Sequence, residues 1–315
     1  MYKVSKALIA MTAVLAISFL ALSANAEYPQ KPINVIVPYG AGGDSDLTTR
    51  VWANAVEKLI GSPVVVINKA GGGGVVGTAF VARSKNDGYT FINAGLGNML
   101  VTPNFSKTPY DFDSFTPIVK MTSVPFAIAV KSDSPYKTFD DFVAAAKASE
   151  LTQGSYGAAS SGTILANIVA DHMGYKPRYV HSNTTAESMV SLIGGHIDSA
   201  MSFPPAFGPH VQAKRARVLV MNQKMDEYPG VPTLKDYGIQ ASLEGWSGIF
   251  APKGVPEEVV TTLIEATKKV MKDPKVLQAY KNMGAIVDFR YGEDWIKDMK
   301  VTYDGMKKAA GKMKK

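Results

Sequence analysis

Short apolar segments alternate with segments of helical spacing along most of this sequence. The short runs suit buried strands, and the longer segments between them repeat their apolar residues every three or four positions. Strands that alternate with helices build an α/β sheet with helices packed on its faces. The alternation predicts a mainly parallel sheet whose strands include residues 34–39, 64–68, 90–94, 154–159 and 199–203.

Residues that cap helices mark where several helices begin and end. Residues 45–60 have helical spacing, and Gly61 suits the left-handed conformation at a helix C-terminus. Thr138 and Thr184 each stand three positions before an acidic residue, which is the spacing of a capping box. We therefore expect helices over residues 45–60, from Thr138 onward, over 162–173 and over 185–193.

The last third of the chain is expected to return to a sheet and then to end in helices. Residues 245–251 have the composition of a buried strand. Pro256 is expected to be the first residue of the next helix, because the N–H that proline lacks has no partner at that position. Asp273 and Pro274 start a shorter helix, which Gly284 ends.

The N-terminus has the layout of a secretory signal peptide. Lys3 and Lys6 precede an uncharged stretch over residues 7–22, and Ala24-Asn25-Ala26 supplies the small residues of a cleavage site. An uncleaved membrane anchor is the alternative, but the stretch is just short of the roughly 20 residues that span a bilayer. We expect residues 1–26 to be removed after Ala26 and the mature chain to be periplasmic.

Composition excludes several classes of chemistry. The chain has no cysteine and only four histidines, which removes disulfides and thiolate nucleophiles and makes a metal site unexpected. The net charge of +7 is mild, and an exported protein does not meet nucleic acid, so we expect no nucleic-acid partner. No cofactor is expected either.

Two loops between a strand and a helix could bind an anion. Residues 38–46 read PYGAGGDSD, and residues 155–163 read SYGAASSGT. Backbone N–H groups at a helix N-terminus lack partners and lie at the positive end of the helix dipole. A single loop of this kind is more often a plain turn. In an open α/β sheet, however, both loops would lie at the carboxyl ends of strands, where ligands bind.

Two acidic residues in the first loop complicate this prediction, because they would repel an anion. One interpretation makes Asp44 the N-cap of the helix and pairs Asp46 with Arg50, one helical turn later. The other lets Asp46 accept a hydrogen bond from a ligand hydroxyl, an ammonium group or an ordered water. The sequence favours neither.

Templates for catalysis are weak or missing. Residues 72–77 fit the G-x-G-x-x-G dinucleotide pattern, but they are separated from the preceding strand, and no acidic residue follows at the distance that the ribose needs. The P-loop, nucleophile-elbow and zinc-protease motifs do not occur. His181 ends a strand and could reach a cleft, although lone histidines are usually structural. We expect no enzyme; the alternative is an exported α/β enzyme that acts on a carboxylate with His181 as base.

A series of modest motifs resembles, in its order and spacing, the solute receptors of tripartite tricarboxylate transporters, the Bug-type periplasmic proteins. The resemblance covers nearly the whole mature chain. It is carried by residues 31–33, 37–39, 42–46, 66–68, 71–77, 87–90, 113–117, 194–198, 229–233 and 246–252.

The resemblance implies a type II periplasmic-binding-protein fold, with two doubly wound α/β lobes joined by crossing hinge strands. Lobe one would comprise residues 27–124 and 230–315, and lobe two residues 125–229. The family holds a carboxylate through the two strand-to-helix loops and bound waters, usually without an arginine. Carried over by position, the resemblance implies that the ligand-binding residues are Tyr39, Ala41, Gly42, Gly43, Asp46, Asn98, Ser160, Ser161, Gly162, Thr163, Phe203 and Pro204. His181 joins this set because it ends a predicted strand and could reach the cleft.

The expected function follows from the resemblance and the loops together. A monomeric periplasmic receptor would close its lobes around a small organic mono- or dicarboxylate and deliver it to the membrane subunits of a tripartite tricarboxylate transporter. A receptor domain that signals to a membrane sensor would share the same cleft and differ only in its partners.

Overall fold

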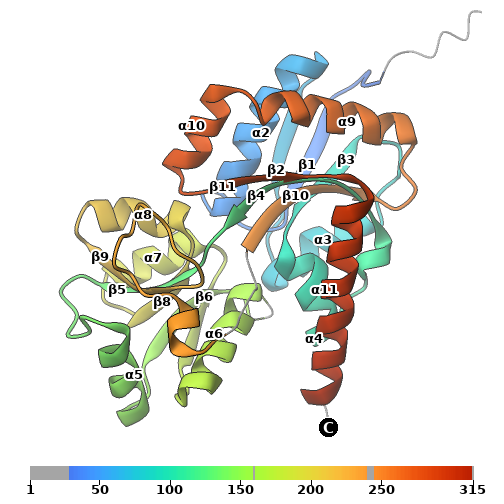
Figure 1. The fold of residues 1–315 in the computed structure, drawn as a ribbon. Coiled ribbons are helices and arrows are strands. Elements are labelled where there is room, and N and C mark those ends of the chain that lie inside the picture. Colours follow the sequence, from blue (N-terminus) through green and yellow to red (C-terminus); the bar gives the residue numbers. More distant parts are fainter. Residues whose placement is uncertain (1–27, 159, 240–244, 314–315) are drawn as a thin grey trace, which may run out of the picture.

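The computed structural model describes residues 28–158, 160–239 and 245–313 and shows two α/β lobes side by side (Figure 1). The expected signal peptide, residues 1–26, lies outside the described residues. None of the helices in the described part of the chain combines the length and the apolar character that a membrane span needs.

Lobe one is built on a six-stranded sheet in the order β11-β4-β10-β3-β1-β2. β2, β1 and β3 run parallel, whereas β10 is antiparallel to β3 and β4, and β11 is antiparallel to β4. The strands are β1 (Ile33–Val37), β2 (Val64–Asn68), β3 (Thr90–Ala94), β4 (Phe115–Val124), β10 (Gly245–Pro252) and β11 (Ile286–Arg290).

Helices cover both faces of this sheet because alternate strand residues point to opposite sides. Val35 packs in one apolar cluster with Trp52 of α2, and its neighbour Ile36 belongs to the cluster on the other face. The Trp52 indole N–H donates to Thr267 Oγ1 at 3.0 Å, which ties α2 to α9. One face carries α2 (Asp44–Ile60), α9 (Glu257–Val270) and α10 (Pro274–Asn282); the other carries α3 (Val75–Ala82), α4 (Thr102–Phe105) and α11 (Gly292–Met313) (Figure 1).

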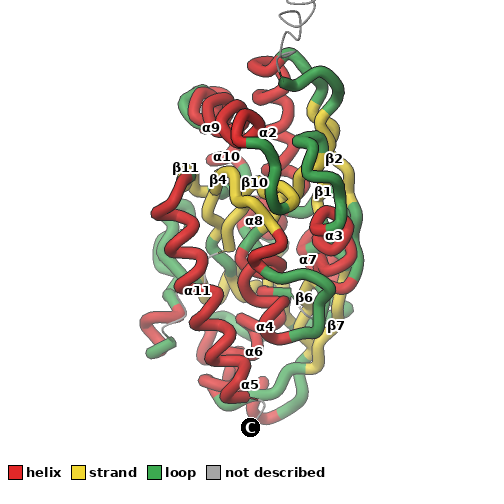
Figure 2. Tube along the Cα trace, turned by 90° about the vertical axis from the view of Figure 1, so that its right-hand side faces the viewer, coloured by secondary structure: helices red, strands yellow, loops and turns green. Residues whose placement is uncertain are grey.

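The long helix α11 runs down one side of the molecule beside α4 (Figure 2). Asn104 Nδ2 donates to the backbone oxygen of Tyr303 at 3.3 Å, and the Tyr303 ring lies 5.8 Å from that of Phe112. Short helical turns complete this lobe: η1 (Gly72–Gly74), the π-helical η2 (Gly97–Val101) and η3 (Phe112–Ser114).

Lobe two is built on a five-stranded sheet in the order β7-β6-β8-β5-β9. Phe142 of α5 and Leu165 of α6 pack on one face, and Met189 of α7 and Phe207 of α8 pack on the other. Its elements are β5 (Ala127–Lys131), α5 (Phe139–Ala148), β6 (Thr152–Tyr156), α6 (Ser161–Met173), β7 (Arg178–Ser182), α7 (Thr185–Ile193), β8 (Ser199–Ser202), α8 (Pro204–Gln212) and β9 (Ala216–Met221).

The chain crosses between the lobes where β4 leads into β5, and it returns between β9 and β10. This crossing explains where the sheets depart from the mainly parallel order that the sequence predicts. A chain that leaves a lobe and comes back must run in opposite directions on the two passes. Consequently β10 lies antiparallel between β3 and β4, and β5 lies antiparallel between β8 and β9. Only β2-β1-β3 and β7-β6-β8 keep the expected parallel order.

The segment before β10 contacts lobe two. Thr233 forms a bridge with Met221 of β9, and Tyr237 in η4 (Leu234–Tyr237) packs edge-on against Phe139 at 4.9 Å. These contacts favour a lobe boundary after residue 239, whereas the sequence placed it at residue 230. The exact division stays a proposal, since residues 240–244 are outside the described part of the chain.

Helix ends agree closely with the capping residues. Gly61 is left-handed at φ 65° after α2, and Thr138 forms a capping box with Asp141 at the start of α5. Thr184 caps α7, which spans the expected residues. Pro256 is the N-cap of α9, so the prediction that it is the first helical residue is wrong by one position.

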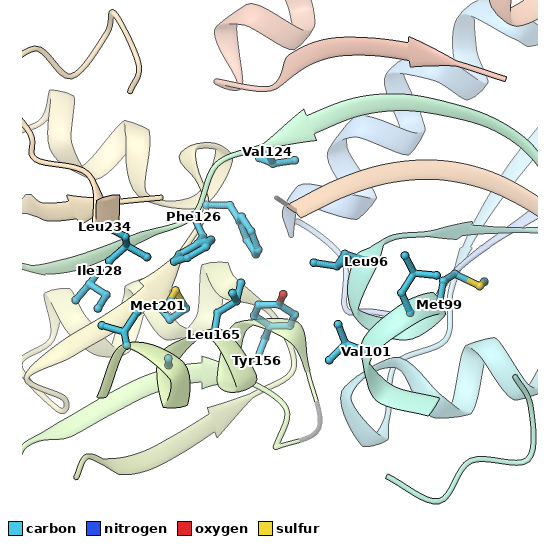
Figure 3. Packing of buried hydrophobic residues seen from close by; sticks show 14 of the residues in the cluster. Leu96, Met99, Val101, Val124, Phe126, Ile128, Tyr156, Leu165, Met201 and Leu234 are labelled. Carbon is cyan, nitrogen blue, oxygen red and sulfur yellow. The ribbon is translucent and has the colours of Figure 1, made fainter. Parts of the chain in front are cut away.

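One apolar cluster continues from lobe one into lobe two at the base of the cleft (Figure 3). Leu96 and Met99 come from lobe one, Tyr156 and Leu165 come from lobe two, and Phe126 lies in the crossing between β4 and β5. Because buried apolar surface stabilises whatever arrangement encloses it, this cluster favours lobes that are packed together.

Candidate functional site

A cavity of about 40 Å³ lies between the lobes. The loops after β1 and β3 approach it from lobe one, and those after β6, β7 and β8 approach it from lobe two, so it lies at the carboxyl ends of these strands. Its lining comprises Tyr39, Gly43, Asp44, Ser45, Gly95, Leu96, Gly97, Val124, Tyr156, Ser161, Asn183, Thr184, Thr185, Phe203, Gly245 and Trp246.

Asp46 holds the lobe-one loop in shape from beneath the cavity. Its carboxylate accepts hydrogen bonds at 2.9 Å from the Gly42 N–H, from Asn68 Nδ2 and from Arg50. Burial acts to raise the pKa of Asp46, but the hydrogen bonds from Arg50, Gly42 and Asn68 outweigh it and lower the pKa. The pairing with Arg50, one of the two interpretations that the sequence left open, is therefore present.

Asp44 lines the cavity and is the first residue of α2. The N-cap position belongs to Gly43, so the interpretation of Asp44 as the N-cap is wrong. Burial raises the pKa of Asp44 to about 6, although hydrogen bonds from the backbone of Asp44 and Ser45 and from Thr185 act in the opposite direction. The Thr185 hydroxyl donates to Asp44 Oδ1 across the cleft at 3.4 Å, which is a long hydrogen bond.

The lobe-two wall consists of hydroxyl groups and two helix N-termini. Ser160 caps α6 by accepting from the Thr163 N–H, and Ser161 lines the cavity while its hydroxyl bonds the Tyr156 hydroxyl at 2.9 Å. Thr184 caps α7 in the same way, so that Thr185 begins that helix at the cavity. First-turn N–H groups have no acceptor within their own helix, which makes this wall a donor surface.

Aromatic rings from both lobes complete the lining. Tyr39 and Tyr156 face each other edge-on across the cleft, with ring centroids 5.7 Å apart. Phe203 packs on Tyr156 at 5.7 Å, and Trp246 approaches from β10. Burial raises the pKa of both tyrosine hydroxyls, so these groups are neutral hydrogen-bond donors at physiological pH.

The lobes approach each other so closely that a Cβ atom would clash at several glycines, of which Gly97 and Gly157 are two. A Cβ atom on Gly97 would lie 2.9 Å from Ser161 Oγ of the opposite lobe. A Cβ atom on Gly157 would lie 2.6 Å from the Cα of Gly73. These contacts, with the bond between Thr185 and Asp44, describe a closed arrangement of the two lobes.

Residues 48–310 match the sequence profile of the tripartite tricarboxylate transporter family receptors. This match covers well over half of the chain. The chain belongs to this family. A protein of Cupriavidus necator named for the gbd 5' region is 33% identical over 271 residues, which cover 84% of this chain and 82% of that protein. The family consists of periplasmic solute-binding receptors that are not enzymes, as the sequence predicted.

Solved structures share the fold of this receptor. The periplasmic binding protein BugD superposes with a TM-score of 0.85 at 26% identity, covering 90% of this chain and 99% of BugD. MatC of Rhodopseudomonas palustris, solved with bound malate, superposes with a TM-score of 0.82 at 23% identity and covers 90% of this chain and all of that one, 100%. The predicted fold of two α/β lobes joined by crossing strands is thus confirmed.

Of the residues that the sequence proposed for binding, Tyr39, Gly43, Ser161 and Phe203 line the cavity of the receptor. Others lie behind the lining and position it. Asn98, for example, is fully buried and accepts from the Gly95 N–H at 2.9 Å. The supporting residues are Asp46, Asn98, Ser160, Gly162 and Thr163, which are buried, and Gly42, which is exposed and donates its N–H to Asp46.

Three proposed residues lie elsewhere. Ala41 is exposed, and Pro204 at the start of α8 contacts Gly284 of lobe one. His181 stacks on Tyr179 and lines a neighbouring groove of about 480 Å³, beside residues 71–74. Burial lowers the pKa of His181. In these positions none of the three lines the cavity.

Sequence reasoning missed part of the lining. Thr184 and Thr185 were recognised only as the start of a helix, and Trp246 only as part of a buried strand. The signal that could have found Thr184 was available, since it is a third hydroxyl-bearing helix N-terminus after a predicted strand. Gly95 and Gly97 follow β3 without any helix-capping signal. No group of three or more potential metal ligands occurs among the residues that the structure describes.

Proposed function

We propose that this periplasmic receptor binds a small organic carboxylate, with one or two carboxyl groups, in the cavity between its lobes. The observation that carries the proposal is that two helices of lobe two, α6 and α7, begin at the cavity, where Ser161 and Thr185 present first-turn N–H donors. Such donors suit a carboxylate. MatC, which shares the fold, was solved with malate, although a likeness at 23% identity extends to the fold alone.

Binding is coupled to closure in this proposal. The ligand touches both lobes at once, so it can bind the closed arrangement more tightly than any open one and shift the equilibrium toward closure. The closed receptor then delivers its ligand to the membrane subunits of a tripartite tricarboxylate transporter. We further propose that it acts as a monomer and that its signal peptide is cleaved after Ala26.

A ligand screen tests this function. The mature protein, residues 27–315, would be screened by thermal shift and then by calorimetry against carboxylates, amino acids, sugars and polyamines. We expect that only compounds with a carboxylate raise the unfolding temperature, and that the bound compound is released unchanged. Stabilisation by sugars or polyamines alone would contradict the proposal, and turnover of the ligand would favour the exported enzyme instead.

Delivery is tested in the source bacterium. Deletion of the gene should abolish uptake of the radiolabelled ligand, and the wild-type gene supplied in trans should restore it. A variant without the predicted signal peptide serves as the control, because it folds without reaching the periplasm and should not restore uptake. Uptake that persists after deletion would remove the transport role while leaving the binding role intact.

A further inference from the structure

We infer that the ligand of this receptor is a zwitterion, which carries a protonated or alkylated nitrogen near its carboxylate, and that Asp44 binds this cationic nitrogen. The inference rests on the proposed function and narrows it from carboxylates in general to those with an ammonium group. Amino acids and betaines have this chemistry.

The charge of the cavity wall is the first argument. Asp44 is the one charged side chain among the described lining residues, and neither lysine nor arginine joins it there. Within residues 28–158, 160–239 and 245–313, no lysine, arginine or histidine forms an ion pair with it. An anionic ligand without a positive group would place like charges together in a confined space, which is unfavourable.

The use of the α2 N-terminus is the second argument. Asp46 already accepts the Gly42 N–H, and the Asp44 carboxylate hydrogen-bonds the first backbone groups of its own helix. The anion seat that the sequence suggests in lobe one is therefore occupied by the chain's own carboxylates. In lobe two the Thr185 and Ser161 hydroxyls bond Asp44 and Tyr156, but the first-turn N–H groups of α6 and α7 at these residues have no acceptor within their helices and remain for the carboxylate of a ligand. The cavity thus has an acidic side and a donor side.

The aromatic lining is the third argument. Tyr39, Tyr156, Phe203 and Trp246 surround the same cavity as Asp44. Aromatic faces attract cations through the ring quadrupole, most strongly where water is excluded, and aromatic cages with a carboxylate recognise ammonium groups. A raised pKa of about 6 at Asp44 agrees with a partly buried carboxylate that has no cation beside it. The titratable groups facing it are the hydroxyls of Tyr39 and Tyr156, which are neutral.

Matched ligand pairs test the inference at pH 7.5 by calorimetry. Each amino acid would be compared with its 2-hydroxy acid and its deaminated acid, as in alanine, lactate and propionate, and glycine betaine would represent alkylated nitrogen. We expect the wild type to bind at least one zwitterion with an affinity about tenfold higher, or more, than its affinity for the matching hydroxy acid and deaminated acid. A charge-assisted hydrogen bond has an effect of this size. Binding by the primary amines or by the betaine identifies which kind of nitrogen the site accepts.

Two variants localise the effect. Asp44→Asn keeps the shape of the side chain and removes its charge, so the preference for the zwitterion over its hydroxy acid should fall to near onefold. Asp226→Asn makes the same charge change at an exposed position of lobe two and should keep the wild-type preference. Thermal unfolding of both variants verifies that they are folded. The comparison of matched ligands on the wild-type protein tests the inference even if a variant does not fold.

The outcomes separate this inference from the proposed function. Lactate or other nitrogen-free carboxylates that bind the wild type as tightly as every zwitterion would overturn the inference and leave the carboxylate receptor intact. The inference is also overturned if Asp44→Asn keeps the preference for the zwitterion over its hydroxy acid. It is overturned as well if Asp44→Asn raises the affinity for nitrogen-free carboxylates and for zwitterions equally. If no carboxylate of either kind binds, the proposed function itself fails.

Discussion

The two walls of the cavity use opposite means to build a binding surface. The lobe-one wall is acidic and is held by the buried carboxylate of Asp46, with Asp44 facing the cavity. The lobe-two wall has no charged lining residue in the described part of the chain and offers hydroxyls and N–H groups at the starts of α6 and α7. A strand-to-helix loop therefore indicates where a cavity forms, whereas the side chains of the loop decide the charge of its wall.

Removal of Asp46 should have the largest effect, because it breaks the framework of the lobe-one wall. Asp46→Ala leaves the Gly42 N–H, Asn68 and Arg50 without their shared acceptor, and we expect a loss of about 3 kcal/mol in unfolding free energy. Denaturant titration measures this loss. Arg50→Ala is the matched control. Because the Arg50 side chain is 44% exposed, its removal should lower the unfolding free energy by under about 1 kcal/mol. Equal losses of unfolding free energy in the two variants would contradict the role of Asp46 as the shared acceptor that holds the lobe-one loop.

A side chain at Gly97 should keep the two walls apart. Its Cβ would press on Ser161 at 2.9 Å, so Gly97→Val is expected to weaken ligand binding by about 2 to 3 kcal/mol through overpacking of the closed arrangement. Calorimetry measures the affinity, and small-angle scattering should show a more open molecule. Gly43→Ala adds a methyl group in the same cleft with ordinary contacts at 3.6 Å and should change affinity far less. Similar affinities for both variants would argue against closure.

The ionised form of Asp44 should destabilise the ligand-free protein. Its pKa is raised to about 6 from an unfolded value of 3.8, so the folded state binds more protons between these pH values and stability falls as pH rises through them. Asp44→Asn should therefore be more stable than the wild type by about 2 kcal/mol at pH 8, with no such advantage below pH 4. Thermal unfolding across this pH range measures the difference. A pH-independent difference would contradict the raised pKa.

Loss of a single donor from the lobe-two wall should have the smallest effect. Ser161→Ala removes a hydroxyl that lines the cavity and bonds the Tyr156 hydroxyl, and affinity is expected to fall by about 1 kcal/mol. Ser149→Ala, at an exposed helix end in the same lobe, is the control. An unchanged affinity for Ser161→Ala would assign carboxylate binding to the helix N–H groups alone.

Most element boundaries could be predicted because they depend on local chemistry. Capping residues such as Thr138 and Thr184 act within one helical turn, and Gly61 needs only its own left-handed conformation. The helix α8 and the strand β11 were not predicted. α8 contains Pro209, which usually argues against a helix interior, and β11 is an edge strand whose residues are all partly or largely exposed. Both form because neighbouring elements hold them.

The binding residues were less predictable than the elements. Ser161 and Gly43 lie on loops with a clear signal, and both line the cavity. Asp44 was treated only as a cap, because the sequence cannot show which of two acidic residues faces the cleft and which turns back to hold the loop. Gly97 carries no local signal at all, since its importance comes from a contact with a residue of the other lobe.

The order of residues is enough to set the alternation of strands and helices, the helix ends and the positions of the two glycine- and hydroxyl-rich loops. These features follow from residue spacing and from hydrogen bonds over a few positions, which any single chain carries in its order. Tertiary structure alone decided the antiparallel crossing strands, the lining of the cavity and the opposite character of its two walls. They depend on contacts such as that between Thr185 and Asp44, which are 141 residues apart and meet only when the lobes pack together.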